Sequence, residues 1–436
     1  MANAWTDQHR LAKNQAIAAR GKATRERRKG QVCRVYELKI TKAKLSSAAQ
    51  AHLARLFVEA KWFYNWILSH EDVFALAARD TKGNEVPVKV GETFETRPLT
   101  CLASQMKQGL LTKTHHSVRG LAQLKTKGHK VGQLKFKRQV NSIPLQQYGN
   151  TYQLFSTPQK IQLQGLRERI RVRGMDQFPP AAEFANAHLL SRQGDYYLHV
   201  TTYQPKAKQP EPPPQRIGLD FGLGHQITFS NGVVLNWNVP FPKRLRRLYR
   251  RFSKAQNGSK NRDKAKMKLL QEFQKYTNRK KEVRNQTVGY LKRNYRIVCF
   301  QNDPFAAWQR LWGKKMLNLS LGAMKRILNE RIHSPSEVSR SFASSQWCSG
   351  GCGSKQKLQL DERTYHCPHC ELIIDRDYNA ARNIEREGFQ QLGMESPEVT
   401  PGEIEASTQA MLAFFERRPF VCASSIQEPG SFTALA

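Results

Sequence analysis

Acidic residues are scarce in this 436-residue chain: 35 Asp and Glu stand against 71 Lys and Arg, for a formal net charge of +36. A positive field of that size attracts polyanions, and nucleic acid is the most available polyanion in a cell. With 39% hydrophobic residues the chain can still bury cores, which excludes disorder throughout. A histone-like or ribosomal-type protein is the alternative, but such proteins are usually short. We therefore expect a nucleic-acid-binding protein of about three domains.

Segments that direct a protein into or across a membrane are also lacking. No run of 18 apolar residues occurs, so we expect no membrane span. The N-terminus is polar and basic and has no apolar stretch of the kind found in secretory signals. Eight cysteines do not make a disulfide scaffold in a chain of this size, and four of them cluster as metal ligands do. These features predict a cytoplasmic protein.

Positive charge is nearly absent from the last 50 residues. Beyond Arg386 only Arg417 and Arg418 are basic, whereas seven residues are Glu. The nucleic-acid surface is therefore expected to lie before this acidic C-terminal segment.

A proline-rich segment, "QPKAKQPEPPP", predicts a domain boundary, because three consecutive prolines cannot sit inside a helix or a sheet. Before it, the basic residues 1–30 read as an arm that orders on RNA, and 31–40 alternate as a half-buried strand does. Further helix is expected over 100–126 after a polar break at 79–97, with short strands over 131–172 and another strand over 196–203. The residues "EIEASTQAMLAFFERRPF" in the C-terminal segment suggest one more helix.

An amphipathic helix is predicted after Ser46 and Ser47, two candidate N-caps, because apolar residues recur there at four-three spacing. These residues are Leu53, Phe57, Ala60, Tyr64 and Ile67. The aromatics of "KWFYNWIL" could stack on bases, but the periodicity favours a place in the core.

Residues 243–296 read as a long helix with 20 basic and three acidic residues. One apolar stripe is formed by Leu245, Leu248, Phe252, Met267, Leu270 and Phe273, and the other faces are basic. Charge runs are usually solvated faces. An excess this one-sided repels itself, however, and favours a phosphate backbone lying along it.

Four cysteines have the spacing of a zinc site: Cys348 and Cys352 form one close pair, and Cys367 and Cys370 form another 15 residues further on. Two such pairs separated by a hairpin-length insertion supply four thiolates to a tetrahedral site. Four ligands leave no open position, so the zinc is expected to be structural. Four unrelated reduced cysteines are the alternative. His366 and His369 could each replace a ligand, but they read as bystanders.

Acidic residues occur at two positions where chemistry is plausible. Asp220 ends a strand in "IGLDFGLG", and Asp375 and Asp377 start a helix in "IIDRDYNAARNI". Each site alone is most simply a turn former or a helix cap. Hydrolysis of phosphodiesters by two metal ions, however, needs carboxylates that converge from separate elements on cations about 4 Å apart.

In their order along the chain, "GLDFG", the basic stretch with "GSKNRDKAK", the four-cysteine hairpin and "DRDYNAARNI" resemble TnpB proteins and the compact type V CRISPR effectors. The upstream "QLKFKRQVNSIPLQQYGNTY" is similar to their guide-RNA-binding wedge region. The resemblance covers most of residues 31–386.

This resemblance implies a multidomain α+β fold: an RNase H-like (RuvC) α/β nuclease domain with an inserted zinc hairpin, and a β-barrel-like wedge domain with an inserted helical recognition domain. The expected segments are 1–45 (basic arm and first wedge segment), 46–130 (recognition), 131–205 (second wedge segment), 206–215 (linker), 216–340 (first RuvC segment, with the basic helices), 341–374 (zinc insert that binds target nucleic acid), 375–386 (second RuvC segment) and 387–436 (acidic tail).

The resemblance also implies two Mg²⁺ or Mn²⁺ ions held by Asp220, a middle acid and Asp377, with Asp375 as a supporting or capping residue. Guide RNA and double-stranded target DNA are the implied partners of a monomer in the bacterial or archaeal nucleoid. Basic residues expected to contact nucleic acid are Arg27, Arg28, Lys135, Lys137, Arg244, Arg247, Arg251, Lys260, Arg262 and Lys264.

The middle acid departs from the family's pattern. An ungapped match of "RIVCFQNDPFAAW" puts Gln301 where the family has Glu, and Gln carries no negative charge. Asp303 lies two residues further on, on the same face of an extended strand. We favour Asp303 as the third ligand; a site without a third acid is the alternative.

Three hypotheses follow. The first is an RNA-guided DNA endonuclease, in which base pairing reads the target and the protein reads a short flanking motif. The second is a guided binding protein that represses without cutting. The third treats the zinc hairpin as a transcription-factor module, but it leaves "GLDFG" and "DRDYNAA" unexplained.

Overall fold

The computed structural model describes residues 2–206, 213, 215–359, 361–393 and 400–426. The chain divides into two compact units, an N-terminal unit of residues 1–208 and a C-terminal unit of residues 209–436. The division falls within the segment expected to be a linker, of which 207–212 and 214 lie outside the described residues. No described helix is long and apolar enough to cross a membrane.

An antiparallel sheet of seven strands forms the centre of the N-terminal unit, in the order β4-β8-β9-β1-β7-β6-β5. Its strands are β1 (Gln31–Ile40), β4 (Ser142–Leu145), β5 (Tyr152–Phe155), β6 (Lys160–Leu163), β7 (Ile170–Arg173), β8 (Glu183–Arg192) and β9 (Asp195–Pro205). The strand predicted over 31–40 is thus confirmed, and its apolar end, Leu38 and Ile40, is fully buried.

An insertion of mainly helical structure separates β1 from the other six strands of this sheet. It holds α2 (Ser47–Leu68), the hairpin of β2 (Glu85–Val90) and β3 (Thr93–Pro98), and α3 (Ser104–Thr126). The hairpin corrects the prediction of a polar break over 79–97. Short 3-10 turns occur at Lys42–Lys44, Val73–Ala75, Ala78–Lys82 and Met175–Gln177.

The predicted amphipathic helix is confirmed as α2. The side chain of Ser46 accepts a hydrogen bond from the backbone N–H of Ala49 and caps the helix. All five positions of the apolar stripe are buried, and so are three aromatics of "KWFYNWIL", namely Trp62, Phe63 and Tyr64. The aromatic cluster therefore belongs to the core.

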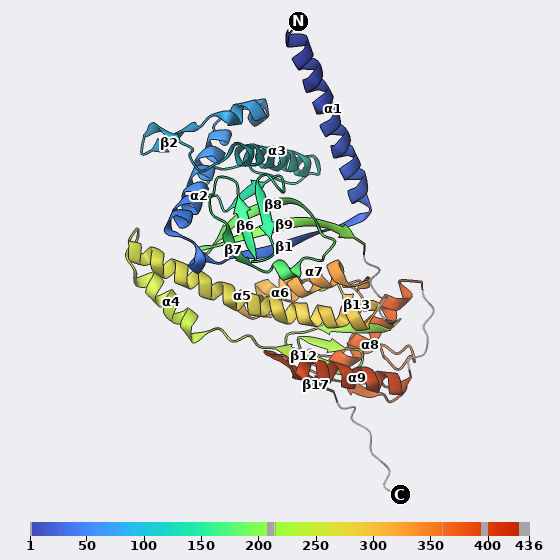
Figure 1. The fold of residues 1–436 in the computed structure, drawn as a ribbon. Helices are drawn as coiled ribbons and strands as arrows, with labels where there is room; N and C mark the ends of the chain where they lie inside the picture. The colour runs from blue at the N-terminus through green and yellow to red at the C-terminus, as the bar shows by residue number, and fades with distance from the viewer. Residues whose placement is uncertain (1, 207–212, 214, 360, 394–399, 427–436) are drawn as a thin grey trace. The chain divides into compact units, whose positions relative to one another are not determined.

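The N-terminal arm is helical, and its ordering on RNA stays a prediction. α1 (Ala2–Lys29), the dark blue helix that begins at the N-terminus in Figure 1, runs without a proline. Its described side chains are mostly exposed. Its C-terminal end is held on the sheet, because the guanidinium groups of Arg27 and Arg28 lie 2.9 and 2.7 Å from Glu183 of β8.

A mixed sheet of six strands forms the centre of the C-terminal unit, in the order β14-β13-β10-β11-β12-β17. β10, β13 and β14 run parallel, and the remaining neighbours are antiparallel. The strands are β10 (Arg216–Phe221), β11 (Ile227–Phe229), β12 (Val233–Trp237), β13 (Ile297–Gln301), β14 (Ser334–Val338) and β17 (Val421–Ser425).

α8 (Arg376–Gln390) packs directly on β10 because Gly218 has no side chain. A Cβ at Gly218 would come within 2.2 Å of the carbonyl oxygen of Ala381, closer than any real contact. The glycine in "IGLDFG" therefore brings the helix of "DRDYNAARNI" onto the strand that carries Asp220.

The basic segment forms two helices, which corrects the prediction of one helix over 243–296. α4 (Lys243–Lys254) folds back along α5 (Lys260–Asn294), as Figure 1 shows. Gly258 makes the turn with φ of +76°, and Ser259 caps α5. The predicted apolar stripe is only partly core, since Leu245 is buried but Phe273 is 41% exposed. α6 (Phe305–Leu319), kinked at Gly313, and α7 (Leu321–Arg331) follow.

Described residues of the acidic C-terminal segment belong to the fold. α9 (Pro401–Glu416) confirms the predicted helix; it begins at a capping box of Thr400 and Glu403 and buries Met411 and Phe415 completely. β17 then pairs with β12 and completes the sheet. This segment is therefore structural, where the sequence suggested a tail.

Candidate active site

Three distant segments bring the expected carboxylates to one end of the mixed sheet. Asp220 is the penultimate residue of β10, and Asp303 follows β13 by two residues. These strands are parallel neighbours, with Leu219 opposite Phe300, so they end at the same edge. Asp377 stands in the first turn of α8.

Asp377 and Asp303 both lie close enough to Asp220 to perturb its carboxyl group. Burial raises the pKa of Asp220 well above its usual value, and the negative charges of Asp377 and Asp303 raise it further. Burial also raises the pKa of Asp303 to about 7, against the opposing charge of Lys325. The pKa of Asp377 is raised as well, first by burial and then by Asp375. Such a group of acids gains most from a bound cation.

A divalent cation fits the donor atoms that are present. The Oδ2 atom of Asp303 is buried and has no hydrogen-bond partner, a costly state that a cation would relieve. Carboxylate oxygens are the ligands that Mg²⁺ and Mn²⁺ prefer. The ligand oxygens of Asp220, Asp303 and Asp377 do not all lie within 4.8 Å of one another, so these residues do not form a cage for one ion. A pair of ions about 4 Å apart spreads its ligands more widely.

Two side chains that can carry positive charge, His225 and Arg363, flank Asp377, and neither stood out in the sequence. His225 Nδ1 lies 3.5 Å from Asp377 Oδ2, and Arg363 Nη1 lies 3.6 Å from the same oxygen. Arg363, and after it His225, oppose the rise in the pKa of Asp377. His225 follows β10 and Arg363 precedes the second cysteine pair, so no spacing along the chain could have joined them.

Gln301 is occupied by the protein backbone. Its Nε2 donates to the carbonyl oxygens of Ser339 and Phe342 at 3.0 and 2.6 Å, and its Oε1 accepts from the hydroxyl of Ser344 at 3.0 Å. Only 7% of the residue is exposed. An amide that donates to two carbonyls tethers the segment after β14, and a carboxylate could not replace it there.

Asp375 has the capping role expected of it. Its Oδ1 accepts from the backbone N–H groups of Asp377 and Tyr378 at 2.9 and 3.0 Å. This carboxylate therefore fixes the first turn of α8, from which Asp377 projects. Arg376 donates to the carbonyl oxygens of Gln359 and Glu362, in the segment between the two cysteine pairs.

The four cysteines form one cluster. Their Sγ atoms all lie within 4.8 Å of one another, with Cys348 3.5 Å from Cys370 and Cys352 3.5 Å from Cys367. A tetrahedral ion with Zn–S bonds of about 2.3 Å holds its sulfurs roughly 3.8 Å apart, so four thiolates fit zinc.

Two knuckles supply these sulfurs. The bridge between Trp347 and Lys355 closes the first, and strands β15 (Thr364–His366) and β16 (Ile373–Asp375) flank the second. β15 lies between the two cysteine pairs, and it pairs with β16, which follows the second pair. Three residues separate Cys348 and Cys352. The last of them, Gly351, and Gly353 just after Cys352 have φ of +86° and +74°, which glycine adopts without strain.

Most of the basic residues expected to bind nucleic acid are exposed. On α4 and α5 these are Arg244, Arg247, Arg251, Lys260 and Lys264, and in the N-terminal unit Lys135 and Lys137. Arg262 is used within the protein: it donates to the carbonyl oxygens of Phe252 and Ala255 and holds the turn between α4 and α5. Arg27 and Arg28 are paired with Glu183.

Comparison with known proteins identifies the segment around the cysteines. Residues 330–384 match the family model described as the Cas12f1-like TNB domain. The resemblance to TnpB proteins and compact type V effectors that was stated from the sequence is thereby confirmed.

A curated relative from Streptomyces pristinaespiralis bears the name "Putative RNA-guided DNA endonuclease". It is 31% identical over 193 residues, which are 38% of this chain and 44% of the relative. The chain therefore matches less than half of that relative's length.

Solved structures of compact effectors show weaker likeness. A Cas12f1-sgRNA-target DNA complex aligns with 82% of this chain and 99% of its own, at 13% identity and a TM-score of 0.43. The mini-RNA-guided endonuclease CRISPR-Cas_phi3 aligns with 85% of this chain and 94% of its own, at 9% identity and a TM-score of 0.39.

Proposed function

We propose that this chain is an RNA-guided DNA endonuclease that hydrolyses phosphodiester bonds of guide-complementary DNA at Asp220, Asp303 and Asp377. The observation that carries the proposal is the convergence of these carboxylates on one site, from a strand end, a turn after a strand and the start of a helix. Burial there raises the pKa of Asp220, and the charges of Asp377 and Asp303 raise it further. The order of strands in the mixed sheet, with antiparallel strands on one side of β10 and parallel ones on the other, supports an RNase H-like (RuvC) assignment.

Asp220, Asp303 and Asp377 would hold two Mg²⁺ or Mn²⁺ ions. When bound, such ions activate the attacking water and stabilise the leaving oxygen. Asp375 fixes the first turn of α8 and so the position of Asp377. Arg363 keeps positive charge beside that carboxylate, where a scissile phosphate needs a partner, and His225 lies against the same oxygen.

The remaining elements fit the same function. The exposed basic faces of α4 and α5 carry enough positive charge to hold a phosphate backbone. The four cysteines would hold a structural zinc that ties the knuckles to the start of α8. Guide RNA and double-stranded DNA are the proposed partners, in the cytoplasm of a bacterium or archaeon, and base pairing would read most of the target.

A guided binding protein without cleavage is the second candidate, and Gln301 favours it. The residue that aligns with the family's middle Glu is held by backbone carbonyls and has no charge to offer an ion. The two candidates differ only in whether Asp303 completes the site.

The test is DNA cleavage by the complex purified with its own RNA, in Mg²⁺ and in EDTA. Replacing Asp220 by Asn is expected to lower the rate by at least about 100-fold, since metal ligands contribute several kcal/mol to such reactions, and to leave DNA affinity unchanged. The matched control is Glu405→Gln, which changes an exposed carboxylate of α9 in the same unit. DNA binding without any Mg²⁺-dependent product would establish the second candidate and remove the first.

A further inference from the structure

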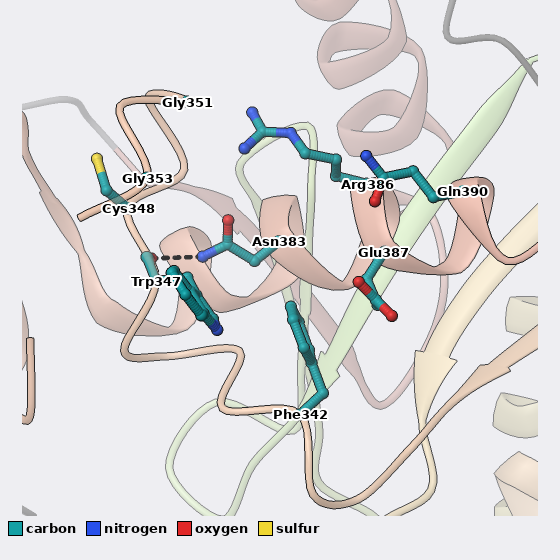
Figure 2. Close-up of a pocket in the computed structure, with 9 residues that line it drawn as sticks. All are labelled: Phe342, Trp347, Cys348, Gly351, Gly353, Asn383, Arg386, Glu387 and Gln390. Carbon is teal, nitrogen blue, oxygen red and sulfur yellow. Dashed lines mark hydrogen bonds between the residues drawn. The ribbon is translucent and has the colours of Figure 1, made fainter. Parts of the chain in front are cut away.

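A cavity of about 350 Å³ lies beside the first cysteine knuckle, outside the group of carboxylates. One wall is the loop from Phe342 to Cys348, and the other is the C-terminal half of α8 (Figure 2). Its volume is at the small end of the range of ligand pockets, roughly 300–1,000 Å³.

The loop wall is aromatic and fixed in place. Phe342 and Trp347 both line the cavity and are half-buried. The carbonyl oxygen of Trp347 accepts from the side-chain amides of Asn379 and Asn383, at 2.8 and 2.6 Å, which anchors the loop to α8. Figure 2 shows the bond from Asn383. Lys355 lies over the indole, with its Nζ 5.2 Å from the ring centroid. A held, half-buried aromatic ring is a surface on which a flat ring can stack.

The helix wall is polar and nearly neutral in charge. Arg386 and Glu387 oppose one another in sign, and Gln390 offers both a donor and an acceptor. Arg386 is oriented by a hydrogen bond of 2.9 Å to the carbonyl oxygen of Ser349, and Gln391 donates to one oxygen of Glu387 at 2.9 Å. A phosphate would select a cationic pocket, whereas a wall with mixed donors and acceptors opposite an aromatic ring suits a nucleobase.

The cavity lies on the same helix as Asp377, which fixes its distance from the carboxylates. At about 1.5 Å per residue, Asn383 and Gln390 lie roughly 9 and 20 Å along α8 from Asp377. A stacked strand advances about 3.4 Å per nucleotide, so this span corresponds to roughly three to six nucleotides.

We propose that this cavity takes one unstacked nucleobase of the DNA strand that is cut, and thereby sets how far from that base the strand is cleaved. The proposal rests on the proposed function and deepens it. The base stacks on Trp347 and hydrogen-bonds to Gln390 and Arg386, while its backbone continues along α8 toward Asp377. DNA is favoured over the guide because the cavity and the cleavage site share one helix.

Photocrosslinking tests occupancy without relying on cleavage. DNA targets that carry 5-iodouracil at successive positions of one strand are bound to the Asp220→Asn complex and irradiated. We expect crosslinking to Trp347 from one position, roughly three to six nucleotides from the cut mapped with the unmodified protein. Crosslinks spread evenly along the strand, crosslinks from RNA alone, or none at Trp347 would overturn the proposal.

Cleavage then tests the role of the bound base. Trp347→Ala is expected to slow cutting about 10-fold or more and to spread the cut over neighbouring bonds, because base stacking on an aromatic ring is lost. An abasic site at the crosslinking position should reproduce this effect and add nothing to it in the variant. If the abasic site slowed cutting by the same factor in the Trp347→Ala variant as in the natural protein, the base and the tryptophan would not contact one another.

Two further variants guard against simple misfolding. Gln390→Ala changes an exposed side chain and is expected to slow cutting about 2- to 10-fold, with the zinc content unchanged. Trp312→Ala removes a tryptophan of α6 that is 45% exposed and outside the cavity, and should leave rate and cut position unchanged. DNA cut at the wild-type bond by both the Trp347 and Gln390 variants would refute the proposal while the nuclease function stands. Crosslinking without any cleavage would refute the nuclease function alone.

Discussion

Replacing Gln301 by Glu restores the family's usual residue, yet we expect it to damage the protein. In the structure the side-chain amide donates to the carbonyl oxygens of Ser339 and Phe342 in a buried position. A carboxylate would leave both carbonyls without donors and face them with negative charge. Each unsatisfied buried group costs about 1–3 kcal/mol, so the variant should lose about 2–6 kcal/mol. For a unit of this size that lowers Tm by roughly 5–20 °C.

The pH dependence of this loss has a definite sign. The introduced carboxyl would be protonated more readily in the folded state, so its folded pKa lies above the unfolded value of about 4.3. The stability difference from the natural protein therefore grows as pH rises from about 4 and levels off above the folded pKa. Differential scanning fluorimetry at several pH values measures it.

Gln309→Glu is the matched control, because it makes the same change at an exposed position of α6 and should shift Tm by less than about 2 °C. If Gln301→Glu kept its Tm and cut DNA faster, Gln301 would occupy the ligand position. The assignment of Asp303 would then fail.

Three further results are expected. Chelation should release about one zinc ion per chain, and Cys352→Ser should prevent that ion from binding. In both cases the hairpin around the fully buried Tyr365 should become sensitive to proteolysis. Glu59→Gln should destabilise the protein by about 3 kcal/mol in thermal unfolding, because that buried carboxylate accepts from three backbone N–H groups and from Arg55. Its lowered pKa means that this stabilisation is present above the unfolded pKa and is lost as pH falls through the folded one. Gly218→Ala should slow DNA cleavage and leave RNA binding intact, since the added Cβ would force α8 off β10.

Each of these results has a control in which the same change meets no buried contact. Cys33→Ser should release no zinc, and Glu26→Gln, at an exposed position of α1, should leave Tm within about 2 °C. Gly120→Ala should stabilise α3 by about 0.5–1 kcal/mol, because a Cβ there meets nothing. Equal effects in variant and control would contradict the structural reason given for each.

Local patterns predicted the elements whose signals are local. The alternation of residues 31–40, the cap at Ser46 and the spacing of the four cysteines each depend on neighbours along the chain, and each is found in the structure. The capping role of Asp375 is local in the same sense. A single long helix over 243–296 failed because Gly258 and Ser259 end one helix and start another at a polar turn that the charge pattern hid.

Contacts between distant segments could not be predicted in this way. Gln301 and Asp303 differ by two residues, and only the position of residues 339–344 shows that the first is tied to the backbone. His225 lies near the start of the unit and Arg363 lies between the two cysteine pairs, yet both approach Asp377. β17 joins the sheet although its segment looked like an acidic tail, because pairing with β12 depends on the fold rather than on charge.

The central claim is that Asp220, Asp303 and Asp377 together hold divalent cations. Electron paramagnetic resonance of Mn²⁺ in the RNA-bound protein measures this directly, with the Asp220→Asn complex as the reference for ions bound by RNA. We expect two additional Mn²⁺ ions with the dipolar coupling of a pair about 4 Å apart, and loss of that coupling in Asp303→Asn. A spectrum unchanged from the reference, or a coupled pair that survives Asp303→Asn, would contradict it.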